Sequence, residues 1–234
     1  MPYFSPFFID YWYLILVVPA LLISVWAQFK VKSTYAKYSD KLVSNGMTGA
    51  DVTRYIQQVN GIHTDIQAVA GELSDHFDPR TNVVRLSEGV YGRSTVAAVG
   101  IAAHETGHAL QHAEGYGPVK LRTAMVPVTN FASGLSPILI LLGIVMSMDA
   151  LAYAGIALFS MATLFQLVTL PVEFNASFRA IDLLVDQNFL DQDEIGGAKK
   201  VLRAAAMTYV AAAFAAIAEL LRLLAIIGLR RGDD

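Results

Sequence analysis

Three long stretches without a charged residue constrain the fold of this chain more than any other feature. They cover residues 11–29, 123–148 and 150–172. An α-helix needs roughly 20 apolar residues to cross the hydrocarbon core of a bilayer, so each stretch is long enough to be a membrane span. The chain is 55% hydrophobic and only 16% charged, with a mean hydropathy of +0.47, which is too apolar for an ordinary soluble domain. The sequence therefore predicts an integral membrane protein.

The second and third stretches are separated only by Asp149, which predicts a hairpin of two antiparallel spans. A fourth apolar stretch, residues 204–229, contains Glu219 and Arg222. These two residues lie three positions apart, so they share a helical face and can pair inside a helix bundle. The alternative is a helix that lies partly along the membrane surface, and we favour a helix that crosses. We thus expect three to four transmembrane helices.

The distribution of basic residues predicts the orientation of these spans. No Lys or Arg precedes the first span, whereas four lysines follow it within residues 30–41. The positive-inside rule therefore places the N-terminus outside and the chain from residue 30 onward in the cytosol. The lack of basic residues before the first span also argues against a cleaved signal peptide. We expect a multi-pass protein of the bacterial inner membrane.

Residues 30–120 contain the local patterns of a small α+β unit. Thr48 and Asp51 form a variant of the capping box, and apolar residues follow at helical spacing until Gly61 ends the helix. Residues 66–70, 73–77 and 83–87 are typical of three short strands, which we expect to form a small antiparallel sheet. Ser94 is the expected N-cap of a second helix that runs to about Ala113.

The second helix of this unit carries His104, Glu105 and His108 in the pattern H-E-x-x-H. Residues four apart share a helical face, so both imidazoles can bind one Zn²⁺. A site that only stored zinc would need no carboxylate between the histidines, whereas hydrolysis needs a base that accepts a proton from water. Glu105 is therefore expected to be the catalytic base. The alternative is a buried helix whose histidines are hydrogen-bonded core residues, and the pattern favours zinc.

A catalytic zinc site usually has three protein ligands, so one remains to be found. The chain has no cysteine, which leaves histidine and carboxylate side chains. His112 lies about 12 Å along the helix from His104, too far to share its metal. The metzincin pattern requires a glycine at position 111 and a histidine at position 114, where this chain has Gln111 and Glu114.

The best candidate for the third ligand is Glu173. His63 and His76 also lie upstream, and for both a structural or substrate-binding role is favoured over metal binding. Glu173 directly follows the hairpin, which returns the chain to the side of the membrane that holds His104 and His108. Ser177 lies one turn further on the same face and could accept a hydrogen bond from the outer nitrogen of a histidine ligand.

Four segments resemble signatures of the YugP-like neutral zinc metallopeptidases of bacterial membranes. The segments are LSDHFDPR at residues 73–80, VRLSEGVY at 84–91, AAHETGHALQ at 102–111 and PVEFNAS at 171–177. That family is similar to the HtpX-type and CAAX prenyl endopeptidases of the gluzincin group. The resemblance implies a membrane zinc peptidase with His104, His108 and Glu173 as zinc ligands and Glu105 as the base. It also implies that strand 83–87 is an edge strand that binds the peptide substrate.

This sequence departs from the wider gluzincin pattern at one position. The pattern E-x-x-x-D has an aspartate that helps to orient the first histidine, and here Ser177 stands in its place. A hydroxyl group, in place of a carboxylate, is then the candidate for the hydrogen bond behind a histidine ligand. Candidates for a donor that stabilises the oxyanion are His76, Tyr91 and Arg179.

The sequence as a whole predicts a mostly α membrane protein with a zincin-like α+β catalytic unit, made of a small antiparallel sheet and the H-E-x-x-H helix. The five expected parts are an N-terminal transmembrane helix (1–29), the cytosolic catalytic unit (30–120), a transmembrane hairpin (121–172), cytosolic helices with the third zinc ligand (173–203), and a C-terminal transmembrane helix (204–234).

The predicted function is zinc-dependent hydrolysis of peptide bonds at the cytosolic face of the membrane. The expected partners are one Zn²⁺, a peptide or protein substrate and the lipid bilayer. The net charge of -3 and the lack of a basic stripe argue against nucleic acid. Two alternatives are an intramembrane zinc protease, and a metal-binding membrane scaffold without catalytic activity. The sequence predicts neither the substrate sequence nor the oligomeric state.

Overall fold

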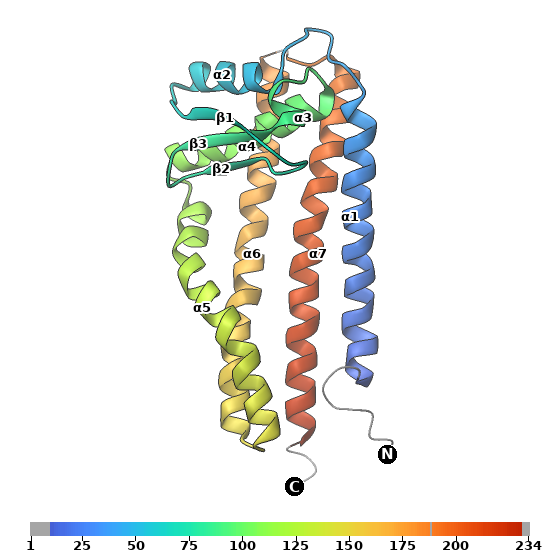
Figure 1. Ribbon diagram of the computed structural model, residues 1–234, viewed down its shortest axis with the longest axis vertical. Coiled ribbons are helices and arrows are strands. Elements are labelled where there is room, and N and C mark those ends of the chain that lie inside the picture. Colours follow the sequence, from blue (N-terminus) through green and yellow to red (C-terminus); the bar gives the residue numbers. More distant parts are fainter. Residues whose placement is uncertain (1–9, 188, 231–234) are drawn as a thin grey trace. The chain divides into compact units, whose positions relative to one another are not determined.

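The computed structural model describes residues 10–187 and 189–230 (Figure 1). The structure is mostly helical. Contacts divide the chain into two units: the first takes in residues up to 27, 120–170 and 208 onward, and the second takes in residues 28–119 and 171–207. The elements are a π-helical turn (Tyr13–Val17), α1 (Val18–Ser39), α2 (Gly49–Asn60), β1 (Asp65–Val69), β2 (His76–Asp78), β3 (Val83–Ser87), α3 (Glu88–Tyr91), α4 (Val96–Ala113), α5 (Gly117–Val145), α6 (Asp149–Asp186) and α7 (Gln192–Arg230).

In the described part of the chain, four helices are long and apolar enough to cross a membrane. They cover Tyr13–Ser39, Gly117–Val145, Asp149–Asp186 and Gln192–Gly228. The expectation of three to four candidate spans is therefore confirmed, and the last apolar stretch is one of them. The expected hairpin is formed by α5 and α6, with Ser147 in the left-handed region (φ 54°) in the turn between them.

Small residues bring the two arms of this hairpin close together within the first unit. A methyl group on Gly143 would lie 2.7 Å from Cβ of Ala152, and one on Gly155 would lie 3.0 Å from the carbonyl oxygen of Ser136. Ser136 Oγ donates a hydrogen bond to the carbonyl oxygen of Gly155 at 2.8 Å. Close approach at small residues is the common way in which membrane helices pack.

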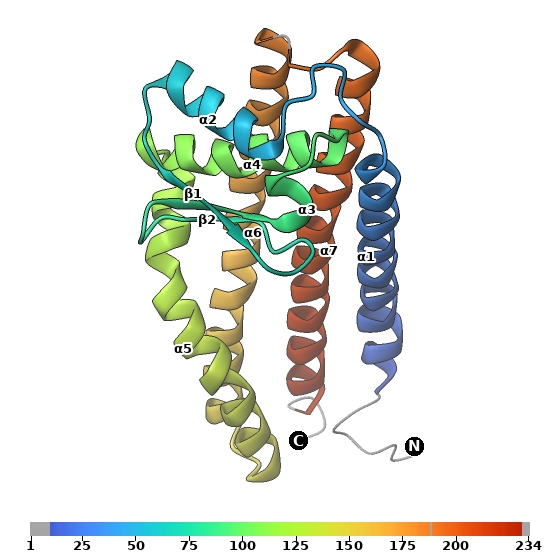
Figure 2. The same ribbon diagram turned by 45° about the horizontal axis from the view of Figure 1, so that its top comes forward.

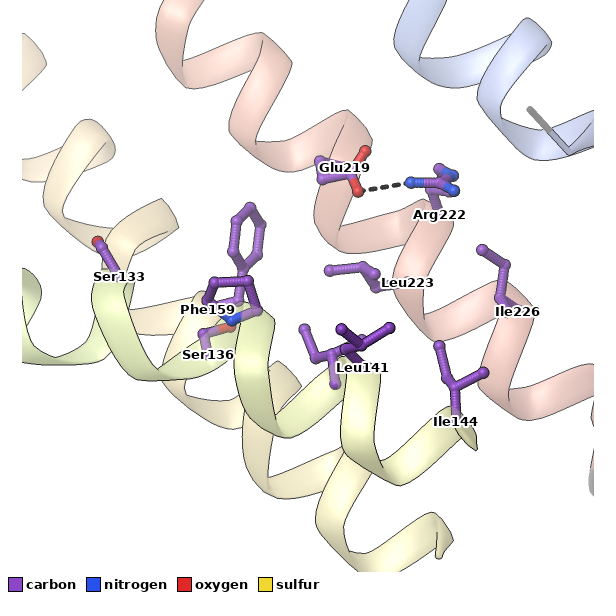
Figure 3. A pocket seen from close by; sticks show the side chains of 11 residues that line it. Ser133, Ser136, Leu141, Ile144, Phe159, Glu219, Arg222, Leu223 and Ile226 are labelled. Carbon is purple, nitrogen blue, oxygen red and sulfur yellow. Dashed lines mark hydrogen bonds and ion pairs between the residues drawn. The ribbon is translucent and has the colours of Figure 1, made fainter. Parts of the chain in front are cut away.

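A charged cluster in the first unit links its N-terminal segment to α7. Arg222 donates to Glu219 at 2.7 Å and to Asp10 at 2.7 and 2.8 Å, and its guanidinium lies 5.2 Å from the centre of the Tyr13 ring. The expected Glu219–Arg222 pair is confirmed. Figure 3 shows this pair beside a mainly apolar cavity of about 320 Å³ between α5, α6 and α7.

The sheet in the second unit is mixed, so the expectation of an antiparallel sheet is wrong for one of its pairs. In the described residues it has three strands in the order β1-β3-β2. β2 and β3 pair antiparallel, whereas β1 pairs parallel to β3 with Asp65 opposite Val83. Alternating side chains identify a strand but not its direction. β2 is also shorter than expected, because Leu73 adopts a left-handed φ of 54° and belongs to a turn.

The central position of β3 corrects another expectation. β3 has a neighbour on both sides, so it cannot be the edge strand that binds a substrate. Val83, Val84, Leu86 and Ser87 are all buried, as expected for the middle strand of a sheet. The free edges of the described sheet belong to β1 and β2.

Helices α2, α3 and α4 of the second unit lie close to the sheet (Figure 2). α2 begins with the expected capping box of Thr48 and Asp51 and ends at Gly61 in the left-handed conformation. The N-cap of α4 is Thr95 and not Ser94 as expected, because the Thr95 hydroxyl accepts from the backbone N–H of Ala98. The Ser94 hydroxyl instead donates to the carbonyl oxygen of Gly46.

The helix α4 is buried on two faces, which accounts for its many small residues. One face packs in a core with Val52 and Ile56 of α2 and Leu184 of α6. The other packs against Val84 and Leu86 of the sheet. A helix with neighbours on both sides cannot carry a wide polar face, so its polar residues have to find partners inside the protein.

Candidate metal centre

His104 and His108 lie on the same face of α4, one helical turn apart. Their ring centres are 4.7 Å apart, and the rings are nearly perpendicular at 81°. Both side chains are largely buried, with 12% and 14% of their surface exposed. The spacing and the burial leave the two Nε2 atoms directed at a common point, where a third group meets them.

The third group is the carboxylate of Glu173 on α6. Its Oε2 lies 3.4 Å from Nε2 of His104 and 3.5 Å from Nε2 of His108. Ligand atoms of these three residues all lie within 4.8 Å of one another, so the group could hold a metal ion. Two histidines from one helix and one carboxylate from another thus converge on one point of the second unit.

Close contact between α4 and α6 makes this convergence possible. Gly107 lies between the two histidines, and a methyl group at this position would lie 3.0 Å from the carbonyl oxygen of Ala176. Few Cβ atoms in proteins have so short a contact, and a backbone carbonyl inside a helix cannot move away easily. Gly107 therefore allows the backbones to approach until Glu173 reaches both imidazoles.

The donor set fits a zinc ion. A histidine nitrogen about 2.0–2.1 Å and a carboxylate oxygen about 2.0–2.2 Å from a tetrahedral zinc lie about 3.3–3.5 Å from each other, which matches both distances to Glu173 Oε2. Among the described residues, this Oε2 is one of the buried side-chain atoms without a hydrogen-bond partner. A buried carboxylate oxygen without a donor is costly, and a divalent cation between it and the imidazoles removes that cost.

Each histidine has a hydrogen-bond partner behind it, at the Nδ1 atom. Ser177 Oγ lies 3.2 Å from Nδ1 of His104, and Gln111 Oε1 lies 2.9 Å from Nδ1 of His108. A partner at Nδ1 holds the ring with Nε2 free for a metal. The sequence predicted Ser177 as such a partner. It did not predict Gln111, although Gln111 lies three residues after His108 and so shares its helical face.

Gln111 is completely buried, and its orientation is fixed by its other hydrogen bonds. Its Nε2 donates to the carbonyl oxygen of Val172 at 2.8 Å and to Oδ1 of Asn175 at 2.9 Å. Since both amide hydrogens are used, Oε1 faces Nδ1 of His108 as an acceptor. His108 therefore carries its proton on Nδ1.

The same chain of hydrogen bonds continues to the surface. Arg179 Nε donates to Oδ1 of Asn175 at 2.8 Å, and its Nη1 donates to Glu114 at 2.7 Å. A guanidinium can only donate, so it fixes the orientation of the Asn175 amide as well. The hydrogen bond to Arg179 also holds the pKa of Glu114 below its ordinary value, against a small effect of burial.

Glu105 is buried on α4 beside the cluster, with 9% of its surface exposed. Burial disfavours a charged His108, but the nearby carboxylates of Glu173 and Glu105 outweigh it and raise the pKa of His108 above its ordinary value. The cluster therefore has a surplus of negative charge that attracts a proton or a metal cation. Glu105 contributes to it without being one of the three grouped residues.

The other residues suggested by the sequence lie elsewhere. His76 is exposed on β2, with Nδ1 2.8 Å from the carbonyl oxygen of Ser74. Tyr91 is half-buried, and its hydroxyl accepts from Arg54 at 3.4 Å. His112 is exposed, and its ring packs against Phe77 at 5.7 Å. His63 is exposed in the loop before β1.

Comparison with known proteins relates the chain to a peptidase family. The family model described as "Putative neutral zinc metallopeptidase" matches residues 13–228. A relative from Bacillus subtilis (strain 168), named "Putative membrane protease YugP", is 50% identical over 211 residues, which are 90% of this chain and 94% of the relative. No solved structure matches the chain. From the extent of the family match and the identity to this relative, we conclude that the chain belongs to the family described as "Putative neutral zinc metallopeptidase".

Proposed function

We propose that the protein is a zinc-dependent metalloendopeptidase. The observation that carries the proposal is the convergence of His104, His108 and Glu173 at distances that suit tetrahedral zinc. The helix that carries the two histidines, α4, also carries Glu105. Family membership supports the same reaction class. The name of the Bacillus subtilis relative describes that protein as a membrane protease, and four apolar helices suit the same location here.

In this proposal His104, His108 and Glu173 hold the zinc ion. Bound zinc would supply a Lewis acid that polarises the scissile carbonyl and makes water more acidic. Glu105 accepts a proton from the attacking water and later passes it to the leaving amine. Ser177 and Gln111 keep the two imidazoles oriented with Nε2 towards the metal.

We propose different roles for the three candidate oxyanion donors, His76, Tyr91 and Arg179, because their side chains have different neighbours. The guanidinium of Arg179 is bound to Asn175 and Glu114, so we assign Arg179 to the positioning of Gln111 and not to the oxyanion. Tyr91 and His76 stay candidates for contact with the substrate. We also propose that an extended peptide pairs with the free edge of β2, since Phe77 of β2 packs against His112, one turn beyond His108.

We further propose a bacterial inner-membrane location with the metal centre on the cytosolic side. The lysines after the first span and the basic residues at 199–203 support this orientation. The intramembrane alternative is less favoured, because α4 is not among the candidate spans of the described chain. A scaffold without activity would not need Glu105.

The decisive experiment measures cleavage of a peptide library by the purified full-length protein. Wild type is expected to cleave library peptides, and Glu105→Gln should lose turnover by several orders of magnitude while it keeps one zinc per chain. Glu72→Gln, which changes an exposed carboxylate, serves as the control and should match wild type. If Glu105→Gln cleaves as fast as wild type, the proposed mechanism is wrong.

Zinc content tests the ligand set separately. Glu173→Ala should lose most bound zinc and all activity, whereas His112→Ala should retain both. Retention of stoichiometric zinc by Glu173→Ala, together with loss of zinc in His112→Ala or Glu114→Ala, would show that the ligand assignment is wrong.

A further inference from the structure

A second cavity, of about 590 Å³, lies between α6 and α7 within the second unit. Its apolar wall consists of Phe174, Phe178 and Ile181 of α6 and Leu202, Ala206 and Met207 of α7. On α6 these residues are four and three positions apart, and on α7 Ala206 and Met207 follow Leu202 by four and five positions, so each set lies on one side of its helix. Phe178 is 66% exposed and Phe174 is 37% exposed, so the wall is open and not part of the core.

One end of the cavity is charged. Lys199 and Arg203 lie one turn apart on α7, and Asp182 of α6 lines the same end. Within residues 10–187 and 189–230, neither Lys199 nor Arg203 forms an ion pair with a carboxylate. Two cations and one carboxylate leave a surplus of one positive charge at this end.

The polarity of the cavity changes in a definite order along the helices. Phe174 follows closely after Leu170, where α6 leaves the first unit, and Met207 precedes the point where α7 enters that unit. Lys199 lies eight residues before Met207, or about 12 Å along the helix. The α7 wall therefore ends in Ala206 and Met207 on the side where the helix enters the first unit, and its two cations lie further along the helix, Arg203 about 6 Å and Lys199 about 12 Å from Met207.

We propose that this cavity binds one anionic phospholipid. An acyl chain lies against the apolar residues of α6 and α7 that line the cavity, and the phosphate group lies between Lys199 and Arg203. A phospholipid has its apolar and anionic parts in the same order as the cavity. Basic residues next to a span attract anionic headgroups by about 1 kcal/mol each, which supports the same ligand.

An acidic peptide is the competing ligand, and the lining favours the lipid. Apart from the three charged groups, Ser177 is the only hydrogen-bonding side chain among the described lining residues. A peptide backbone would leave most of its N–H and C=O groups without partners against such a wall, whereas an acyl chain has none to satisfy.

Ser177 connects the cavity to the metal centre. It lines the cavity, and its Oγ lies 3.2 Å from Nδ1 of His104. A bound acyl chain excludes water from this serine and strengthens its hydrogen bond to the imidazole. Anionic lipid should therefore tighten zinc binding, and this second part of the inference rests on the proposed zinc site.

The test is native mass spectrometry of the full-length protein in detergent, with added phosphatidylglycerol or phosphatidylcholine. Wild type should bind one phosphatidylglycerol in preference to phosphatidylcholine. Lys199→Gln with Arg203→Gln should weaken phosphatidylglycerol binding about 10- to 30-fold. The control is Lys200→Gln, which removes one positive charge from an exposed neighbour outside the cavity and should stay within about twofold of wild type.

Three further measurements, with Glu105→Gln protein, with glycerol 3-phosphate and with a glutamate-rich peptide, separate the lipid from other ligands and from the protease proposal. The binding is repeated with Glu105→Gln protein, whose lipid affinity should equal that of wild type even if no protease activity is ever found. Glycerol 3-phosphate, which lacks acyl chains, should not displace the lipid at millimolar concentration. Equal binding of both lipids, an unchanged affinity of the double variant, or displacement of phosphatidylglycerol by a glutamate-rich peptide would overturn the proposal.

Discussion

Ser177 and Gln111, the hydrogen-bond partners of the two histidines, differ in how strictly they fix the position of the imidazole proton. A serine hydroxyl can donate or accept, so Ser177 suits either proton position of the His104 ring. Both hydrogens of the Gln111 amide are donated to other groups, so towards His108 the amide can act only as an acceptor. The sequence could predict His104, His108 and Glu105 from spacing, because a helix fixes that geometry locally. It could not predict the role of Gln111, because its partners Val172 and Asn175 lie on another helix.

Gln111→Leu is predicted to weaken zinc binding about 10- to 100-fold, because His108 loses the acceptor that orients it. Leucine also leaves the Val172 carbonyl and the Asn175 amide with one partner less. Zinc affinity can be measured by competition with a chromogenic chelator. Gln67→Leu, on the exposed part of β1, is a control that should bind zinc as wild type does. Unchanged zinc affinity in Gln111→Leu would contradict the assigned role.

The elements of the second unit depend on a few backbone contacts that local patterns do not reveal. Capping by Thr48 and Asp51 was predictable, because both residues belong to one turn of chain. The parallel pairing of β1 with β3 was not, because a strand's direction depends on the path of the loop that follows it. Gly107 likewise gives no signal of its own, since the neighbour that requires it, Ala176, is 69 positions away on another helix.

Gly107→Ala is predicted to separate α4 from α6 and to weaken zinc binding without changing a ligand. Overpacking of this kind typically costs about 1–3 kcal/mol of stability. Gly196→Ala is the matched control, because a methyl group there meets no atom within 4 Å. The control should be neutral, or stabilised by about 0.4–1 kcal/mol. Thermal unfolding and zinc titration of both variants check this, and equal behaviour of the two would refute the role of the close contact.

Asp75 provides a test of pH dependence at the turn before β2. Its carboxylate accepts from the backbone N–H and the hydroxyl of Ser87, yet burial outweighs these bonds and raises its pKa above the ordinary value. As pH rises from about 4, the unfolded chain releases this proton first. The free energy of unfolding therefore falls as pH rises from the pKa of Asp75 in the unfolded chain to its raised pKa in the folded protein.

Asp75→Asn is predicted to be at least as stable as wild type at pH 7, because asparagine can keep both hydrogen bonds to Ser87 without a charge. The advantage should shrink below about pH 4, where wild-type Asp75 is protonated in both states. Melting temperatures of both proteins across this pH range supply the test. A difference that does not depend on pH would contradict the assignment.

At the scale of the whole molecule, the apolar stretches of the sequence determine most of what could be predicted. Charge-free runs of span length can be recognised without any tertiary information, and all of them lie in the four apolar helices. The Glu219–Arg222 pair was visible from its spacing, whereas Asp10, the second partner of Arg222, was not, because it lies more than 200 positions away.

Orientation in the membrane is predicted to place residue 149 outside the cell and residues 40 and 190 inside. The chain has no cysteine, so single-cysteine variants at these positions give an unambiguous signal. A membrane-impermeant maleimide applied to intact cells should label position 149 and leave the other two unlabelled until the cells are opened. Strong labelling of position 190 in intact cells would place Glu173 on the wrong side for the proposed orientation.

The arrangement of the sheet also has a consequence for local unfolding. β1 is joined to the sheet only through β3, and its side chains are exposed or half-buried, whereas β2 and β3 form a hairpin with a short connection. β1 can therefore detach while the hairpin stays intact, as an opening of lower free energy than global unfolding. Amide hydrogens in the β1–β3 pair should exchange with deuterium well before those in the β2–β3 pair, so this side of the sheet opens first when the protein is stressed.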